Sequence, residues 1–245
     1  HHIAVDGWSV GLLLEEFRRL YSAETTGTSA NLPAAEASYA DFVTWQAQML
    51  GGAEGTAHRD YWRDRLGEPL PVLDLPTDRP RPPRRSLDGG TLHFRLPHAL
   101  TQAARDLSRQ ERTTPFTLLL AVYEVLLARY SGQHDILVGT PMAGRSRSEF
   151  EGVIGYFANP VVLRGDLSGD PSFRVFLDRM RRTVLDALSH QDYPFPQLVE
   201  TLQPTRDPSR TPLFDAAFDL QSFDRIGPMV ALPTPASSRA TSSSR

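Results

Sequence analysis

The residues with the clearest capacity for chemistry open the chain, which begins His1-His2-Ile3-Ala4-Val5-Asp6-Gly7. Histidine takes up and releases a proton near neutral pH, so it is a common general acid or base. The Asp-Gly pair indicates a turn, because glycine adopts backbone angles that other residues resist. This heptad therefore predicts a proton-transfer group at the end of a short strand, where the backbone turns sharply.

The two histidines cannot both face one site if the heptad is a strand. Successive side chains of a strand point to opposite faces, so one histidine faces a site while the other packs inside. We expect His1 to be the packed, structural residue. The same divergence argues against a metal ion held by both rings, since a metal needs converging ligands. A purification-tag remnant is a further alternative, and the apolar run behind the histidines argues against it.

The composition limits the classes of function. The 245 residues allow one large or two small domains, and a hydrophobic content of 40% supplies a core. A net charge of −3 gives no indication of nucleic-acid or membrane binding, and no apolar stretch approaches the ~20 residues of a membrane span. The absence of cysteine excludes disulfides, thiolate catalysis and Cys-ligated zinc, and it fits a reducing, cytoplasmic setting. Motifs typical of serine hydrolases, zinc proteases and P-loop proteins are missing from the sequence.

Hydrophobic periodicity predicts an α/β fold. Helices are expected over residues 8–21, 39–50, 58–66, 100–110, 116–130 and 172–189, the fifth of them apolar nearly all round and therefore buried. Strands are expected over residues 91–96, 135–139, 160–164 and 214–220. Asp6 or Ser9 is expected to cap the first helix, and Thr114-Pro115 to start the fifth. The proline-rich residues 73–85 predict an extended connection.

The remaining histidines lie in less informative surroundings. His190 is expected to stabilise a helix end. The others stand among polar residues, and we expect them at the surface: His58, His93, His98 and His134.

The heptad, followed by Trp8-Ser9, resembles the signature of the condensation domains of non-ribosomal peptide synthetases, members of the chloramphenicol-acetyltransferase-like superfamily. Several acyltransferases of that superfamily share the heptad, so the resemblance to condensation domains in particular depends on the matches further along the chain. They follow in the family's order: Gly139-Thr140-Pro141 with Gly144-Arg145, then Ile154-Gly155-Tyr156-Phe157-Ala158-Asn159, then His190-Gln191-Asp192-Tyr193-Pro194-Phe195, then residues 206–214. Ala158 and Pro160 depart from the usual Val and Thr, which we expect to reshape a tunnel wall without touching the chemistry.

The resemblance implies a two-lobed chloramphenicol-acetyltransferase-like fold with a truncated N-terminal lobe. Residues 1–66 would form the end of that lobe and carry the heptad, and residues 67–235 would form the C-terminal lobe. The Ser-rich residues 236–245 are expected to be a disordered tail. Because both lobes enclose the tunnel in this family, we expect the isolated chain to be inactive.

The resemblance also implies an activity. In the family, the amine of an aminoacyl thioester on a downstream peptidyl carrier protein attacks an acyl or peptidyl thioester on an upstream one. The carriers supply phosphopantetheine arms, the domain itself binds no cofactor or metal, and an adenylation domain belongs to the same assembly line. Two alternatives remain: a stand-alone acyltransferase that uses acyl-coenzyme A, and a non-catalytic fragment that only binds a carrier protein.

Residue roles follow from the same resemblance. His2 would be catalytic, as a base or as a positioning group for the amine. The Gly7 N–H would help to hold the oxyanion. His1 would be structural, and Asp6 would pair with Arg145 beside the site. Two residues are expected near the tunnel, each with a plainer alternative: Ser9 as a helix cap and Asn159 as a turn residue.

Overall fold

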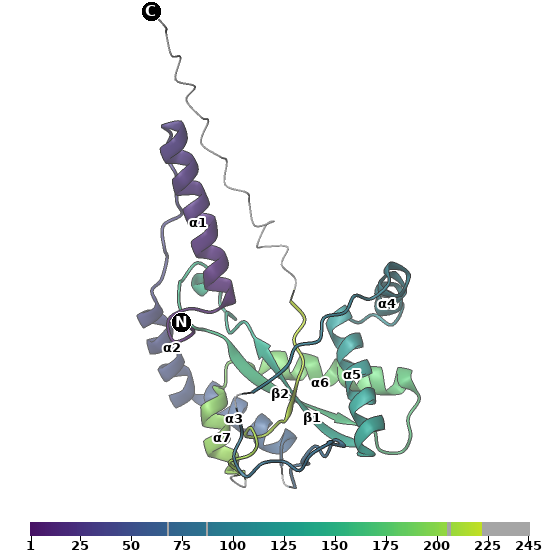
Figure 1. The fold of residues 1–245 in the computed structure, drawn as a ribbon. Helices are drawn as coiled ribbons and strands as arrows, with labels where there is room; N and C mark the ends of the chain where they lie inside the picture. The colour runs from purple at the N-terminus through teal and green to yellow at the C-terminus, as the bar shows by residue number, and fades with distance from the viewer. Residues whose placement is uncertain (68, 87, 205–206, 222–245) are drawn as a thin grey trace, which may run out of the picture.

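A small mixed sheet organises the fold in the computed structural model, which describes residues 1–67, 69–86, 88–204 and 207–221. Strand β1 (Asp135–Met142) lies in the middle, in the order β2-β1-β3. It pairs antiparallel with β2 (Asn159–Asp166), from Asp135 opposite Asp166 to Met142 opposite Asn159. The short β3 (Ala216–Ala217) pairs parallel with β1 on the other edge (Figure 1).

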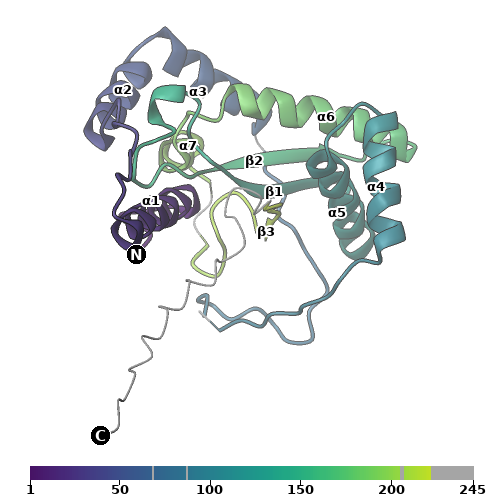
Figure 2. The same cartoon turned by 90° about the horizontal axis from the view of Figure 1, so that it is seen from above.

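Several helices pack against this sheet and against one another. α6 (Phe173–Ser189) packs along β2 and against α5 (Pro115–Ser131), which also contacts β1 and α4 (His98–Gln110). α3 (Ala53–Arg65) packs against α2 (Tyr39–Gly51) and α7 (Phe195–Leu202). α1 (Gly7–Thr26) extends away from this body (Figures 1 and 2), and a 3₁₀ turn covers Ser148–Phe150.

Local sequence signals set most helix ends. Thr114 accepts a hydrogen bond from the Thr117 amide at the start of α5, and Pro115 occupies the first helical position. Gly132 ends this helix in the left-handed conformation, at φ 73°. Ser38 starts α2 with a capping box formed with Asp41. The predicted helices are confirmed, but α1 continues five residues beyond its predicted end and α3 begins five residues before its predicted start. α7 was not predicted from the sequence.

Two groups of buried side chains hold the fold together. The larger joins α3, α5, α6, α7 and the sheet through residues such as Trp62, Leu163 and Met180. The smaller consists of Phe42, Phe150, Val153 and Phe157. Trp62 and Leu66 belong to the larger group, so this group continues across the expected boundary at residue 66. That boundary stays a prediction, and the expected tail at 236–245 lies outside the described residues.

Two predicted strands are wrong. Residues 2–4 form a turn in which the Ala4 amide donates to the His1 carbonyl at 3.0 Å. Residues 91–96 run without regular structure, and Leu92 and Phe94 are 86% and 77% exposed. An alternating pattern predicts which side chains could share a face, but a strand also needs a partner, and these segments have none among the described residues.

Two other expectations are partly wrong. The strand over residues 214–220 is reduced to β3, because Leu213 adopts a positive φ of 69° just before it and only Ala216–Ala217 pair with β1. α5 is not buried on all sides: Val122, Leu126 and Tyr130 form an exposed stripe at 48–65% exposure. The extended connection over 73–85 and the strands at 135–139 and 160–164 are confirmed. Within the described residues, no helix is long and apolar enough to cross a membrane.

Candidate functional site

Asp6 joins the start of α1 to the segment 155–157. Its Oδ1 accepts a hydrogen bond from the Ser9 amide at 2.8 Å, which makes Asp6 the N-cap of α1. Its Oδ2 accepts from the Phe157 amide at 3.0 Å, and its own amide donates to the Gly155 carbonyl at 3.1 Å. The heptad is therefore anchored through its aspartate, which is 4% exposed.

Arg145 approaches the same aspartate from the loop after β1. Its Nη2 lies 3.3 Å from Asp6 Oδ1 and donates to Ser9 Oγ at 2.8 Å. Its Nη1 donates to the carbonyls of Phe150 and Val153 at 2.5 and 2.7 Å. The guanidinium also lies over the Phe157 ring, 3.9 Å from its centroid. The expected contact between Asp6 and Arg145 is thus present, inside a larger hydrogen-bonded cluster.

Charges in this cluster shift one another's pKa. Burial acts to raise the pKa of Asp6, but the Ser9 and Phe157 amides and the charge of Arg145 outweigh it, so the pKa lies below its usual value. Burial lowers the pKa of Arg145, and Asp6 acts in the opposite direction. The pair is therefore ionised at neutral pH, with its carboxylate saturated by donors.

Ser9 is fully buried and has a structural position. Its hydroxyl donates to the Gly155 carbonyl at 2.8 Å and accepts from the Gly155 amide at 3.0 Å. Because its single proton is committed to Gly155, the hydroxyl has none to donate to a substrate. The helix cap is Asp6 rather than Ser9, whose amide is the group being capped.

Close backbone approach in this cluster depends on two glycines. A Cβ on Gly144, at φ +65°, would lie 1.9 Å from the Phe157 carbonyl oxygen. A Cβ on Gly155 would lie 2.2 Å from the Tyr39 ring. Tyr39 also donates its hydroxyl to the Tyr156 carbonyl at 2.8 Å, so α2 braces the segment that holds Asp6.

Both histidines of the heptad are exposed. His2 Nδ1 lies 3.3 Å from the Val5 carbonyl oxygen, and its ring meets Tyr156 edge-on at 6.2 Å. His1 Nδ1 accepts from the Ile3 amide at 3.2 Å. The expectation that His1 packs inside is wrong, because residues 2–4 turn and the alternation of a strand does not apply.

Gly7 is the first residue of α1 and is exposed. Helix geometry leaves the N–H of this position without an intrahelical partner, and the helix dipole favours negative charge there. Apart from its two neighbours in the chain and the backbone of its own helix, no atom lies within 4 Å of the place that a Cβ would occupy. The start of α1 thus offers a backbone donor beside open space.

Asn159, the first residue of β2, uses its whole side chain to hold the loop between α6 and α7. Its Nδ2 donates to the carbonyls of Gln191 and Tyr193 at 2.9 and 2.8 Å. Its Oδ1 accepts from the Phe195 amide at 2.9 Å. The side chain therefore acts as a brace two residues beyond Phe157, and the turn alternative is wrong because Asn159 lies in a strand.

Comparison with known proteins decides the family, because residues 1–241 match the Condensation domain family. The chain belongs to this family. It is 46% identical over 223 residues to one of the linear gramicidin synthase proteins of Brevibacillus parabrevis, covering 91% of this chain and 4% of that protein. The condensation fold accounts for the α/β mixture and confirms the predicted superfamily fold.

Solved structures agree with this assignment. The X-domain from teicoplanin biosynthesis superposes with a TM-score of 0.78 at 27% identity, covering 89% of this chain and 49% of that one. The four-domain non-ribosomal peptide synthetase AB3403, bound to AMP and glycine, gives a TM-score of 0.79 at 26% identity, covering 96% and 18%. The chain thus spans about half of the X-domain chain and a few per cent of the gramicidin synthase protein.

Sequence reasoning missed one residue that braces the condensation-domain site and one buried contact outside it. Tyr39 lies on the predicted second helix, but nothing in its pattern indicates that its ring reaches Gly155. His58, expected at the surface, is 6% exposed and contacts His190. His93, His98 and His134 are exposed as expected. A contact between residues 132 positions apart leaves no periodic signal in either segment.

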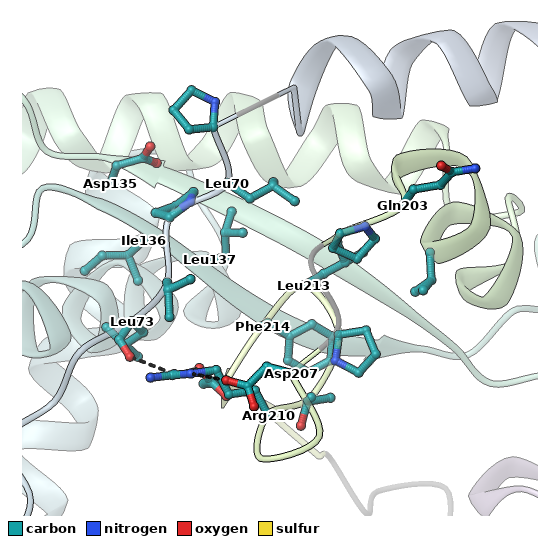
Figure 3. A pocket seen from close by; sticks show the side chains of 18 of the residues that line it. Leu70, Leu73, Asp135, Ile136, Leu137, Gln203, Asp207, Arg210, Leu213 and Phe214 are labelled. Carbon is teal, nitrogen blue, oxygen red and sulfur yellow. Dashed lines mark hydrogen bonds and ion pairs between the residues drawn. The ribbon is translucent and has the colours of Figure 1, made fainter. Parts of the chain in front are cut away.

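A cavity of about 1330 Å³ lies beside the first half of β1, apart from the heptad. Its walls are largely apolar, and Arg210 at its edge contacts Asp207, Asp215 and the Leu73 carbonyl (Figure 3). No residue of the heptad lines it, and Arg210 is already paired with both aspartates. In the described part of the chain, no cluster of His, Cys, Asp or Glu could hold a metal ion.

Proposed function

We propose that this condensation domain forms an amide bond between two substrates, each delivered on the phosphopantetheine arm of a peptidyl carrier protein. The observation that carries the proposal is the anchoring of the heptad: Asp6 is fixed by three buried contacts while His2 and Gly7 remain exposed. The synthase relatives support carrier and adenylation partners on the same assembly line. The absence of cysteine supports a cytoplasmic setting.

The reaction joins the amine nitrogen of the acceptor to the thioester carbonyl carbon of the donor. A C–N bond forms, the C–S bond breaks, and the amine loses one proton while the departing thiolate gains one. The attacking amine must be uncharged, and an α-amino group has a pKa near ~8. A base within reach of the nitrogen therefore helps at neutral pH, and tethering both substrates raises their effective concentration.

His2 is suited to hold that proton. A carbonyl oxygen can only accept a hydrogen bond, so Nδ1 carries the hydrogen in its contact with Val5. In the neutral ring Nε2 then keeps its lone pair. That nitrogen would take the proton from the amine, or orient the amine and stabilise its charge, and pass the proton to the leaving thiolate.

Gly7 would act on the other side of the carbonyl. Its N–H, at the positive end of α1, would donate to the oxygen that becomes negative as the nitrogen attacks. Asp6, Arg145 and Ser9 touch no substrate in this scheme. They are positioning residues that fix the direction of the first turn of α1 and so the direction of this N–H.

The test compares three versions of the intact synthetase polypeptide with loaded carriers on both sides. We expect His2→Ala to reduce amide formation by ~10²–10⁴-fold. His134→Ala removes an exposed histidine outside the site and serves as the matched control. Full activity of His2→Ala would contradict the catalytic role assigned to His2. Turnover with acyl-coenzyme A and no donor carrier would favour a stand-alone acyltransferase, and inactivity of the unaltered domain with carrier binding retained would favour a binding module.

A further inference from the structure

A pair of histidines outside the heptad lies in direct contact. His58 on α3 and His190, the C-cap of α6, approach with their Nδ1 atoms 2.8 Å apart and their rings nearly perpendicular. His190 also stacks on Tyr61 at 4.0 Å, and its carbonyl accepts from the Trp62 indole at 3.0 Å. His58 is buried, so this contact is part of the interior that joins α3 to the end of α6.

The chemistry of this contact restricts its protonation. A hydrogen bond between two imidazoles needs one ring nitrogen with a hydrogen and one with a lone pair. The bond therefore forms when both rings are neutral, and it is charge-assisted when the pair carries one extra proton. When both rings are protonated, each nitrogen is a donor and the two charges repel. The contact then cannot persist at 2.8 Å.

Charged and titratable groups surround the pair on each element packed against it. Glu54 on α3 lies 3.8 Å from His58 Nε2, Asp186 lies on α6, and Asp192 follows in the loop. Burial and the neighbouring His58 lower the pKa of His190, while Asp186 acts to raise it. Burial raises the pKa of Asp192, while Ser146 and His58 act to lower it. Asp186 therefore favours a proton on His190, while burial and the neighbouring His58 oppose it.

The pair is connected to the heptad through short steps. His190 leads into the loop 191–195, which the Asn159 side chain holds by three hydrogen bonds. Asn159 follows Phe157 by two residues, and the Phe157 amide binds Asp6. A shift of the loop would therefore act on Asn159 first, and through it on the segment that orients the start of α1.

We propose that His58 and His190 form a proton-sensitive clamp, which holds the loop 191–195 on α3 and lets go when both rings are protonated. Both residues are positioning residues, because neither touches the heptad or the exposed face beside Gly7. The consequence for amide formation rests on the proposed function. The clamp itself does not rest on the proposed function, because the loop 191–195 can be observed without substrates.

The test follows the Phe195 amide, which donates to Asn159, by NMR-detected hydrogen exchange between about pH 7.5 and 5, alongside the imidazole nitrogen signals. In the unaltered chain, exchange at Phe195, corrected for the intrinsic effect of pH, should rise by about 10-fold as the pH falls from about 7.5 to 5, the factor that one buried hydrogen bond of ordinary strength carries.

Three variants sharpen this test. His58→Gln keeps a side chain that can bond to His190 but cannot become charged, so the acid-induced rise should disappear. His58→Leu should show the faster exchange at every pH. His134→Gln, an exposed control, should behave as the unaltered chain. The clamp is overturned if His58→Gln loosens in acid as the unaltered chain does, or if His58→Leu leaves Phe195 fully protected at neutral pH.

An activity measurement then extends the test in the intact synthetase. We expect His58→Gln to extend the acid limb of kcat to lower pH without changing KM. An unchanged acid limb, together with the expected exchange result, would confine the clamp to the loop and overturn its effect on the heptad. If the domain forms no amide bond at all, the proposed function fails while the exchange result still decides the clamp.

Discussion

Ser9 and Gly155 exchange two hydrogen bonds across 146 positions of sequence: the hydroxyl donates to the Gly155 carbonyl at 2.8 Å and accepts from its amide at 3.0 Å. The hydroxyl thus bonds to both backbone polar groups of Gly155, as a neighbouring strand would in a sheet. It also accepts from Arg145, so three partners depend on a single buried oxygen.

Removing that oxygen should be costly. Ser9→Ala leaves the buried Gly155 amide without its partner, at about 1–3 kcal/mol for a group left unsatisfied. It also removes one of two hydrogen bonds to the Gly155 carbonyl and one of two acceptors of Arg145 Nη2, which both keep a contact with Asp6. We expect a drop in melting temperature of at least ~2 °C, since each kcal/mol corresponds to roughly 2–4 °C in a chain of this size. Ser22→Ala, an exposed serine on the same helix, is the control. Equal melting temperatures for the two variants would contradict the bonding scheme.

The ion pair between Asp6 and Arg145 can be measured in a double-mutant cycle. Breaking a buried pair from one side costs roughly 3–5 kcal/mol, so Asp6→Asn and Arg145→Ala should each lower stability in urea unfolding. The double variant should lose less than the sum of the two. The pKa of Asp6 lies below its usual 3.8, so the stabilisation is present above that pH and is lost as the pH falls further. Strict additivity would rule out the direct contact.

Glu124 predicts a different pH dependence. Both of its carboxyl oxygens are buried without a hydrogen-bond partner in the described chain. Burial raises its pKa well above the usual 4.5, so the folded protein keeps a proton that the unfolded chain releases above that pH. The stability that this group contributes is therefore present below about 4.5 and is lost as the pH rises toward the folded pKa.

Glu124→Gln should accordingly be more stable than the unaltered chain at about pH 8, and the difference should shrink as the pH is lowered to about 5. Thermal unfolding at both values measures this. Glu36→Gln, an exposed residue, should show no such trend. A gain that is the same at both pH values would mean that Glu124 does not hold its proton in the folded state.

Gly144 should tolerate no side chain. It combines a φ of +65° with a carbonyl oxygen 1.9 Å from any Cβ, so Gly144→Ala must strain the backbone and displace Phe157. The conformation alone costs about 1–2 kcal/mol, and the displacement adds to this. Gly152→Ala, where a Cβ would meet open space, should leave the melting temperature nearly unchanged. Comparable losses in the two variants would show that the close approach is not what matters.

Local signals account for what could be predicted. Thr114-Pro115 and Gly132 mark the ends of α5 because caps depend on residues within one turn of the helix end. The contact between Asp6 and Arg145 was expected from the family resemblance, and neither residue's surroundings in sequence indicate it. Family membership was likewise visible in the order of several short blocks.

Contacts between segments that are distant in sequence account for the features that could not be predicted. The apolar run after His1 has the composition of a strand but no partner to pair with among the described residues, so it turns instead. His58 stands among polar neighbours in sequence, and its burial comes from His190, which packs on it from another helix. Ser9 looks like a capping residue, and only the approach of Gly155 gives its hydroxyl a different use.

The close packing of Tyr39 against Gly155 has a consequence for how related sequences can vary. The tyrosine ring occupies the volume that any side chain at position 155 would need. Its Cδ2 atom lies 2.2 Å from the place that a Cβ on Gly155 would take. The two positions therefore cannot drift independently. A member of the family that carries a larger residue at the place of Gly155 should carry a smaller one at the place of Tyr39. A larger residue at the place of Gly155 alone should be removed by selection.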